Sequence, residues 1–304
     1  MSRTVVFDSY GAAEVLHVID VDPPEPGPGQ IRVEVRAAGV QPFDALFRRG
    51  AAQQWLPARF PQRLGNEFAG VVDAVGSGVA TFTVGAEVLG WAMLTSYAEH
   101  VVVGAGDVVP KPAAMPWTEA GVVSASGQTA WSALRQLRID GSDTLLVHAA
   151  AGGVGSFAVQ LARARGAVVI GTASERNHGY LRTLGAIPVA YGDGLVDRVR
   201  AAAPDGVDVA LDASGTVEAL RASLDLVGSP ERVGTVAFQP AAAELGIRRL
   251  STERSAEQLR ELTGLYAAGA LRVTIDRAYP LAEAASAHRA IETGHARGKI
   301  VLVP

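Results

Sequence analysis

The sequence contains no cysteine, and this absence excludes several kinds of chemistry. Disulfide bonds, thiolate catalysis and zinc sites with a cysteine ligand all require a residue that the 304-residue chain lacks. A chain without cysteine agrees with a reducing compartment. The opening segment, "MSRTVVFDSYG", also lacks the charged and then apolar stretches of a signal peptide. We therefore expect a cytoplasmic protein.

Clusters of basic residues and uninterrupted apolar spans are absent as well. The formal net charge is −4, and no cluster of Lys or Arg offers a basic face, so nucleic-acid binding is disfavoured. Residues 145–162 approach the length of a membrane span, but three glycines and a histidine interrupt them. A strand, a loop and a helix explain this stretch better, and no membrane association is expected.

The composition that remains is that of a globular protein, with 48% hydrophobic and 19% charged residues. A chain of this length favours two domains. Residues 1–117 are rich in valine and in turn residues. Within them "QIRVEVRAAGV" alternates apolar and polar residues after the turn-rich "DPPEPGPG". This pattern predicts a compact, mostly β domain.

Strands and helices alternate after Trp117. Thr118 is a plausible N-cap of the first helix, with Glu119 in its first turn. The strands "TLLVHA", "AVVIGTA", "DVALDA" and "RVGTVAF" alternate with expected helices at 153–165, 175–184 and 216–227. Such alternation predicts an α/β fold in which helices cover both faces of a parallel sheet.

The end of the chain has the same strand and turn pattern as residues 1–117. Residues 270–304 contain "LRVTIDRAYPL", an expected helix and a last strand, "GKIVLVP". We therefore expect one domain from residues 1–117 and 270–304, with a nucleotide-binding domain of residues 118–269 inserted in it.

A glycine-rich loop lies between the first strand and helix of the inserted domain. The dinucleotide fingerprint G-x-G-x-x-G aligns with Ala150, Gly152 and Gly155. The second glycine lets the backbone approach a pyrophosphate, and the third lets helix and strand pack closely. The helix start, at Gly153 and Val154, offers unpaired N–H groups and about half a positive charge to phosphates. The loop predicts a dinucleotide site.

The end of the next strand bears on the choice of cofactor. NAD requires an acid there for the ribose 2′-OH, whereas the 2′-phosphate of NADP requires an open position with a cation nearby. The acidic position falls on Ala173, and Ser174 and Arg176 follow it with a hydroxyl and a guanidinium. This favours NADPH. If the strand ran two residues further, Glu175 would bind the ribose and NADH would be favoured.

The segments "HAAAGGVGSFAVQLARARGA", "SASGQTAWSAL", "LGNEFAGVVDAVGSGV" and "ARGKIVLVP" resemble the medium-chain dehydrogenase/reductase superfamily. Its zinc-independent quinone oxidoreductase-like and enoyl reductase-like branch is the most similar part. The resemblance covers the chain in order. It implies a GroES-like β domain, a Rossmann domain with a doubly wound parallel sheet, and a cleft between them. It also implies a homodimer formed through the Rossmann sheet.

The resemblance also shows where this chain departs from the zinc-dependent relatives. Gln41 and Asn66 stand where those relatives have a catalytic cysteine and histidine. The two closest histidines, His288 and His295, are seven residues apart on a predicted surface helix, and we interpret them as ordinary surface or packing residues. No metal is therefore expected.

Hydrogen-bond donors for the substrate oxygen are implied at matched positions. The amides of Gln41 and Asn66 are candidates, and Tyr97 offers a phenol, although a packed strand residue is an equal alternative. Asp44 and Glu67 are expected to be structural, the first in a turn and the second buried.

Further cofactor contacts are implied by the same resemblance. Thr129 and Phe238 would lie near the nicotinamide, and Tyr191 would flank the 2′-phosphate. His148, at the end of a strand, is expected to be a satisfied core residue.

The expected function is an NADPH-dependent, metal-independent reductase that transfers hydride to a quinone or an activated C=C bond of a small molecule. The cofactor would carry the chemistry, and the protein would supply donors for the developing oxyanion and a path for a proton. Two alternatives stay open. One is an enoyl-thioester reductase of a polyketide or fatty-acyl pathway, and the other is an NADPH-binding protein without turnover.

Overall fold

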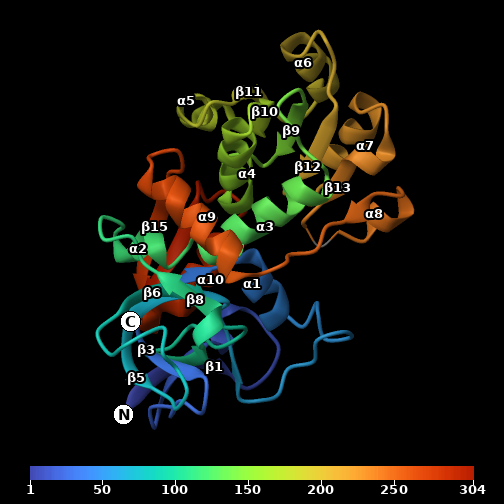
Figure 1. Cartoon of the computed structure of the whole chain (residues 1–304). Coiled ribbons are helices and arrows are strands. Elements are labelled where there is room, and N and C mark those ends of the chain that lie inside the picture. The colour runs from blue at the N-terminus through green and yellow to red at the C-terminus, as the bar shows by residue number, and fades with distance from the viewer. Residues whose placement is uncertain (238) are drawn as a thin grey trace. The chain divides into compact units, whose positions relative to one another are not determined.

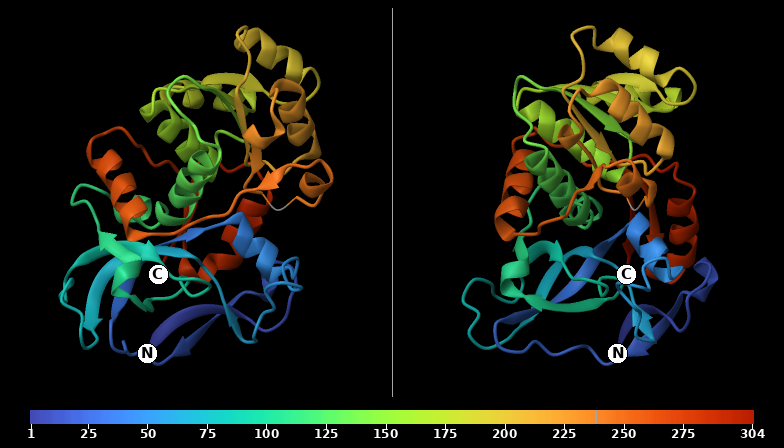
Figure 2. Two further views of the ribbon diagram at one scale, coloured as in Figure 1. Left: turned by 45° about the vertical axis from the view of Figure 1, so that its right-hand side comes forward. Right: turned by 90° about the vertical axis from the view of Figure 1, so that its right-hand side faces the viewer.

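The chain folds into two compact units, which Figures 1 and 2 show in a computed structural model that describes residues 1–237 and 239–304. The first unit comprises Met1–Ala125, Ser255–Ala267 and Arg272–Pro304, and the second comprises Ser126–Arg254 with Ala268–Leu271. The first unit extends beyond residue 117 because Trp117 packs against a buried group formed by Ala37, Val122 and Val301.

The first unit is built on two β-sheets. The larger, seven-stranded sheet has the order β15-β16-β3-β5-β6-β8, and β7 also pairs with β3. Its strands are β3 (Gln30–Val40), β5 (Glu67–Val75), β6 (Glu87–Trp91), β7 (His100–Gly104), β8 (Val108–Pro110), β15 (Ile275–Pro280) and β16 (Lys299–Val303). The three-stranded sheet has the order β2-β1-β4, formed by β2 (His17–Val21), β1 (Ser2–Phe7) and β4 (Gln62–Arg63).

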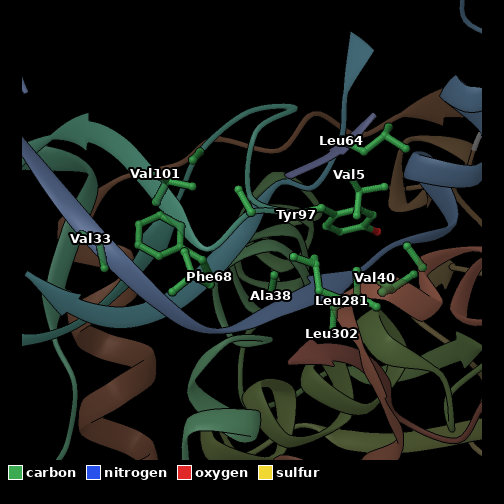
Figure 3. Close-up of a cluster of buried hydrophobic side chains, with 14 of the residues drawn as sticks. Val5, Val33, Ala38, Val40, Leu64, Phe68, Tyr97, Val101, Leu281 and Leu302 are labelled. Atoms are coloured by element: carbon green, nitrogen blue, oxygen red, sulfur yellow. The ribbon is translucent and has the colours of Figure 1, made fainter. Parts of the chain in front are cut away.

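The alternation seen in the sequence sets which side of β3 is buried. Ile31, Val33 and Val35 point into the core, and the residues between them are only half-buried. Figure 3 shows Val33 near Phe68 and Val101 in this core, and the ring of Tyr97 near Val5.

Helices complete the first unit. They are α1 (Pro42–Arg48), α2 (Trp117–Ala120), α9 (Ala256–Ala267) and α10 (Ala284–Glu292). The last strand, β16, pairs antiparallel with β3, so that Ile300 faces Val40. The end of the chain therefore forms one sheet with the strands of its first part.

The second unit contains a six-stranded sheet of order β11-β10-β9-β12-β13-β14, in which all pairs are parallel. The strands are β9 (Thr144–His148), β10 (Val168–Ala173), β11 (Ile187–Ala190), β12 (Val209–Asp212), β13 (Val233–Thr235) and β14 (Arg248–Arg249). The helices are α3 (Ser124–Gln136), α4 (Gly153–Ala164), α5 (His178–Thr183), α6 (Leu195–Ala202), α7 (Val217–Leu226) and α8 (Ala241–Glu244).

The strand order of this sheet confirms the predicted α/β fold. The chain runs outward from β9 through β10 to β11, returns to β12 on the other side of β9, and continues to β14. This is a doubly wound sheet, and its strand order reverses between β9 and β12. Ligands of such sheets bind outside the carboxyl ends of the strands at this reversal.

Two local expectations are corrected. Helix α2 begins at Trp117 with Pro116 as its cap, because the extended backbone of Pro116 precedes the helix, and Thr118 lies inside it. The expected helix at 175–184 begins with a 3₁₀ turn at Glu175–Asn177 before α5. Among the described residues, no helix has both the length and the apolar character needed to cross a membrane.

Candidate functional site

A buried polar cluster in the first unit is centred on Asp44. This residue lies in the first turn of α1, where Pro42 follows the N-cap, rather than in the expected loop turn. Its carboxylate accepts hydrogen bonds from the Gln41 backbone amide at 2.9 Å, the Asn66 Nδ2 at 2.6 Å and the Tyr97 hydroxyl at 2.8 Å. Three segments far apart in the chain are thus tied to one fully buried carboxylate.

The electrostatics of this cluster follow from its burial. Burial raises the pKa of Asp44 to about 6, although the hydrogen bonds from Tyr97 and Gln41 and the charge of Lys299 act in the opposite direction. Burial and the neighbouring Asp44 carboxylate raise the pKa of Tyr97 well above its usual value. The phenol therefore stays protonated, and its O–H donates a hydrogen bond to Asp44.

Glu67 forms a second centre in the same cluster. It is fully buried at the start of β5 and pairs with Lys299 Nζ at 3.0 Å, an ion pair between the first residues of two strands. The Ala125 amide donates to its other oxygen at 2.6 Å, and the side-chain amide of Gln41 also donates to Glu67. The buried glutamate predicted from the sequence therefore has Lys299 as its partner.

A third group lies between α1 and α10. The Tyr97 hydroxyl is 3.4 Å from His288 Nε2, and Arg48, fully buried, pairs with Glu292 at 2.5 Å. Burial, reinforced by the charge of Arg48, lowers the pKa of His288 to about 3. In the part of the chain that the structure describes, Arg48 Nε, Arg48 Nη1 and His288 Nδ1 have no hydrogen-bond partner.

The surface position expected for His288 is wrong. Helix α10 turns Ala284, Ala287 and His288 into the core, whereas His295 lies beyond the end of the helix and is exposed. The spacing of Ala284, Ala287, His288 and Ile291 is that of one buried helix face, and this signal in the sequence places His288 inside.

The three candidate donors all belong to this interior. Gln41 is 8% exposed, Asn66 3% and Tyr97 0%, and each donates to a buried carboxylate. The contacts of Tyr97 favour its interpretation as a packed residue. Each amide has two N–H groups, so Gln41 and Asn66 both keep a second donor. Within residues 1–237 and 239–304, no group of three or more His, Cys, Asp or Glu side chains could hold a metal ion.

The glycine loop of the second unit follows β9 directly. Gly152 is the N-cap of α4, and no side chain of the described residues caps that helix end. The first amides of α4 therefore have no partner within the helix and can serve a ligand. A Cβ at Gly152 would meet only the Ala149 carbonyl, at 3.3 Å, whereas a Cβ at Gly155 would lie 2.7 Å from the Cα of Ala150. These residues fit a pyrophosphate that approaches the backbone at Gly152.

Alanine at the first fingerprint position is accommodated by the neighbouring strand. The left-handed residue of the loop is Ala149, with φ 53°, and the Ala150 amide donates to Thr172 at 3.0 Å. A Cβ at Gly171 in β10 would lie 2.8 Å from the Ala150 methyl group. Gly171 has no side chain, and this leaves room for the Ala150 methyl group at the position where the fingerprint has glycine.

Buried polar residues support the strand ends beside this loop. His148 ends β9 and contacts Ser223 at 3.1 Å and Thr172 at 3.3 Å, and burial lowers its pKa to about 4. It is a satisfied core residue, as predicted. Asp212, at the end of β12, accepts hydrogen bonds from the Ser214 amide at 2.8 Å and from the Thr235 hydroxyl at 2.7 Å. No motif in the sequence marks Asp212, which fixes the loop after β12.

The end of β10 carries the predicted cofactor-selecting residues. The strand ends at Ala173, Ser174 is half-buried, and Glu175 and Arg176 are exposed in the following 3₁₀ turn. Tyr191 follows β11 and is 54% exposed. Because Ala173 and Ala190 are paired in register, Ser174 and Tyr191 leave neighbouring strands at the same edge.

The remaining predicted cofactor residues are less informative. Thr129 lies in α3, where its hydroxyl is 2.9 Å from that of Thr252. Phe238 lies outside the described residues.

A doubly wound sheet with a glycine loop after its first strand, together with a β unit, defines a class of dinucleotide-binding oxidoreductases. Comparison with known proteins agrees. Residues 27–113 match the alcohol dehydrogenase GroES-like domain, and residues 184–302 match the zinc-binding dehydrogenase family. The chain is 33% identical to a quinone oxidoreductase of Pseudomonas aeruginosa, and the match covers 100% of both. The chain therefore belongs to the quinone oxidoreductase branch of the medium-chain dehydrogenase/reductase superfamily, with a GroES-like and a Rossmann domain.

Two further similarities bear on function. The chain is 34% identical over 96% of its length to a mycocerosic acid synthase-like polyketide synthase of Mycobacterium tuberculosis, of which it spans 15%. The structure of Escherichia coli quinone oxidoreductase complexed with NADPH superimposes with a TM-score of 0.88 at 28% identity, covering 99% of this chain and 100% of that one.

Proposed function

We propose that this protein is an NADPH-dependent, metal-independent reductase that transfers hydride to a quinone or to an activated C=C bond of a small molecule. The observation that carries the proposal is the carboxyl edge of the second unit. There the uncapped start of α4 adjoins β10, which ends at Ala173 without an acid and is followed by Ser174 and Arg176. The similarity to an NADPH-complexed quinone oxidoreductase supports it.

Each part of this edge has a distinct role in the proposal. The backbone amides of residues 153–155 would hold the pyrophosphate, whereas the Gly152 amide donates to the Ala149 carbonyl at 3.0 Å. Ser174, Arg176 and Tyr191 would hold the 2′-phosphate. The nicotinamide, when bound, supplies the hydride, and Thr129 and Phe238 stay predicted neighbours of its ring.

The buried cluster suggests how the substrate oxygen would be stabilised. Glu67 accepts one side-chain N–H of Gln41, and Asp44 accepts one of Asn66, which fixes the orientation of both amides. The second N–H of each amide would donate to the oxygen on which negative charge develops. The single O–H of Tyr97 is already donated to Asp44, so we assign the proton that completes the reduction to water. Gln41 and Asn66 carry amides at the positions where the zinc-dependent relatives have a cysteine and a histidine, and this supports hydride transfer without zinc.

An enoyl-thioester reductase is the second candidate, and the similarity to a polyketide synthase favours it. A non-catalytic NADPH-binding protein is the third. We also propose that the protein acts in the cytoplasm as a homodimer, without nucleic acid or membrane partners.

Turnover with three substrate classes separates these candidates. NADPH oxidation should be measured with a series of quinones, alkyl enones and crotonyl thioesters at equal concentrations. We expect turnover with quinones or enones; activity on the thioester alone would favour the second candidate, and no oxidation with any electrophile the third.

Two variants test the assignment of donors. Asn66→Ala should lower kcat by about 10²-fold, the usual cost of one oxyanion donor. Tyr97→Phe is the matched control inside the same cluster and should retain most of kcat, because its hydroxyl is not the proton source. A larger loss in Tyr97→Phe than in Asn66→Ala would reverse the assignment.

A further inference from the structure

The loop that follows β11 is held by one side chain. Arg198 in α6 donates hydrogen bonds to four consecutive carbonyl oxygens, with Nε to Ala190 at 3.0 Å, Nη1 to Asp193 at 2.6 Å, and Nη2 to Tyr191 at 3.3 Å and to Gly192 at 3.0 Å. A guanidinium carries only donors in a rigid fork, and the loop offers it only acceptors.

The backbone of the loop is shaped for this contact. Gly192 and Gly194 have φ values of 91° and 75°, in the left-handed region that glycine tolerates. The Gly192 amide donates to Glu218 of α7 at 3.0 Å, which fixes the same peptide from its other side. The loop therefore has one defined conformation, and Arg198 supplies most of the bonds that hold it.

This conformation determines where Tyr191 lies. Its strand is paired with β10 so that Ala190 faces Ala173, and adjacent strands are about 4.8 Å apart. Tyr191 and Ser174 thus leave the sheet side by side. The ring of Tyr191 is 54% exposed, although the backbone beneath it is fixed. Four of the five N–H groups of the Arg198 guanidinium are donated to these carbonyls, so its contacts are with the loop.

We propose that Arg198 is a positioning residue for cofactor selectivity. By holding the loop after β11, it keeps Tyr191 beside the 2′-phosphate that Ser174 and Arg176 bind. This inference rests on the proposed NADPH site and adds a residue that acts on the site without touching the cofactor.

The test is a fluorescence titration of the full-length protein with NADPH and with NADH. Arg198→Ala should weaken NADPH binding about tenfold, or about 1.4 kcal/mol, and leave NADH binding close to wild type. The NADPH affinity of Arg198→Lys should lie between those of the wild type and Arg198→Ala, because an ammonium cannot reproduce the planar fork of a guanidinium. Arg200→Ala is the matched control: it lies on the same helix, its side chain is 62% exposed, and it should change neither affinity.

A double variant shows whether Arg198 acts through Tyr191. If it does, Arg198→Ala with Tyr191→Ala should lose no more NADPH affinity than the worse single variant. Equal losses for NADPH and NADH in Arg198→Ala, or additive losses in the double variant, would overturn the inference. If Arg198→Ala does not fold, Arg198→Lys and its combination with Tyr191→Ala carry the same test.

Failure of this inference can be told apart from failure of the proposed function. A wild-type preference for NADPH that persists in Arg198→Ala overturns the role of Arg198 alone. Equal affinity of the wild type for the two cofactors overturns both.

Discussion

The polar cluster around Asp44 in the first unit and the strand edge at Ser174 in the second differ in how far their polar residues are buried. In the first unit, Asp44 and Glu67 are fully buried, and their hydrogen-bond partners come from segments far apart in the chain. In the second unit, Arg176 and Tyr191 are exposed at the ends of two parallel strands, with Ser174 half-buried beside them. Polar groups that are buried and paired fix the structure around them, whereas the carboxyl ends of parallel strands are where ligands of such sheets bind.

Gln41 and Asn66 combine the two properties, because they are buried and paired but also have a second N–H group. Each spends one donor on a buried carboxylate and keeps a second. The comparison therefore predicts that substitutions in the cluster reduce stability first, and that substitutions at the edge reduce cofactor affinity first.

The largest effect is expected from Lys299→Met. It removes one partner of a buried ion pair and leaves Glu67 uncompensated, which should lower the free energy of unfolding by about 3–5 kcal/mol. Chemical denaturation measures this. Arg289→Met, which breaks the exposed pair with Glu14, is the control within the same unit and should cost about 0–1 kcal/mol. Restoration of part of the loss by Glu67→Gln in the Lys299→Met background would confirm the uncompensated charge as its cause.

A pH-dependent effect of about 3 kcal/mol is expected from Asp44. Its pKa is about 6 in the folded protein, above the usual value of 3.8, so the folded state binds the proton more tightly than the unfolded state. The cost of the buried charge is fully present above about pH 6 and is relieved as the pH falls to about 4.

The stability difference between wild type and Asp44→Asn isolates this contribution. The wild type should gain stability relative to the variant as the pH is lowered from 7 to 4, as measured by denaturation at several pH values. A difference that does not change with pH would contradict the buried, titrating carboxylate.

Smaller effects are expected at the glycine loop, where one substitution should mainly reduce stability and another should mainly reduce cofactor affinity. Gly155→Ala would force a methyl group against the backbone of Ala149 and Ala150 and should cost about 1–3 kcal/mol of stability. Gly152→Ala would place its methyl group 3.3 Å from one carbonyl, that of Ala149, so it should lower the melting temperature less than Gly155→Ala does, but the methyl group would stand where the pyrophosphate approaches. Its dissociation constant for NADPH should therefore rise, and equal melting temperatures and equal affinities for the two variants would contradict these roles.

The features predicted from sequence are those that local patterns encode. The bounds of β3 match the quoted alternating segment, and the glycine loop lies between β9 and α4. The strand after it ends at Ala173, as counted from the sequence. Each of these depends on residues within about one element, for which periodicity and turn chemistry are sufficient signals.

The buried cluster could not be predicted in the same way. Glu67 and Lys299 are 232 residues apart, and Asp44 and Tyr97 are 53 apart, so no local pattern connects them. Arg198 was missed for another reason, because its partners are backbone carbonyls, which every sequence contains. His288 is the exception, since its spacing with Ala284 and Ile291 marks the buried face of α10.

The central claim is that the edge at Ser174 and Arg176 selects NADPH, and the most direct measurement is the ratio of the dissociation constants for NADH and NADPH in wild type and Arg176→Ala. A charge-assisted contact of about 1.5–3 kcal/mol predicts a preference for NADPH of about tenfold or more that is largely lost in the variant. Glu175→Ala is the neighbouring control and should keep the preference. Equal affinities in the wild type, or weaker NADH binding in Glu175→Ala, would contradict the claim and assign the ribose to Glu175.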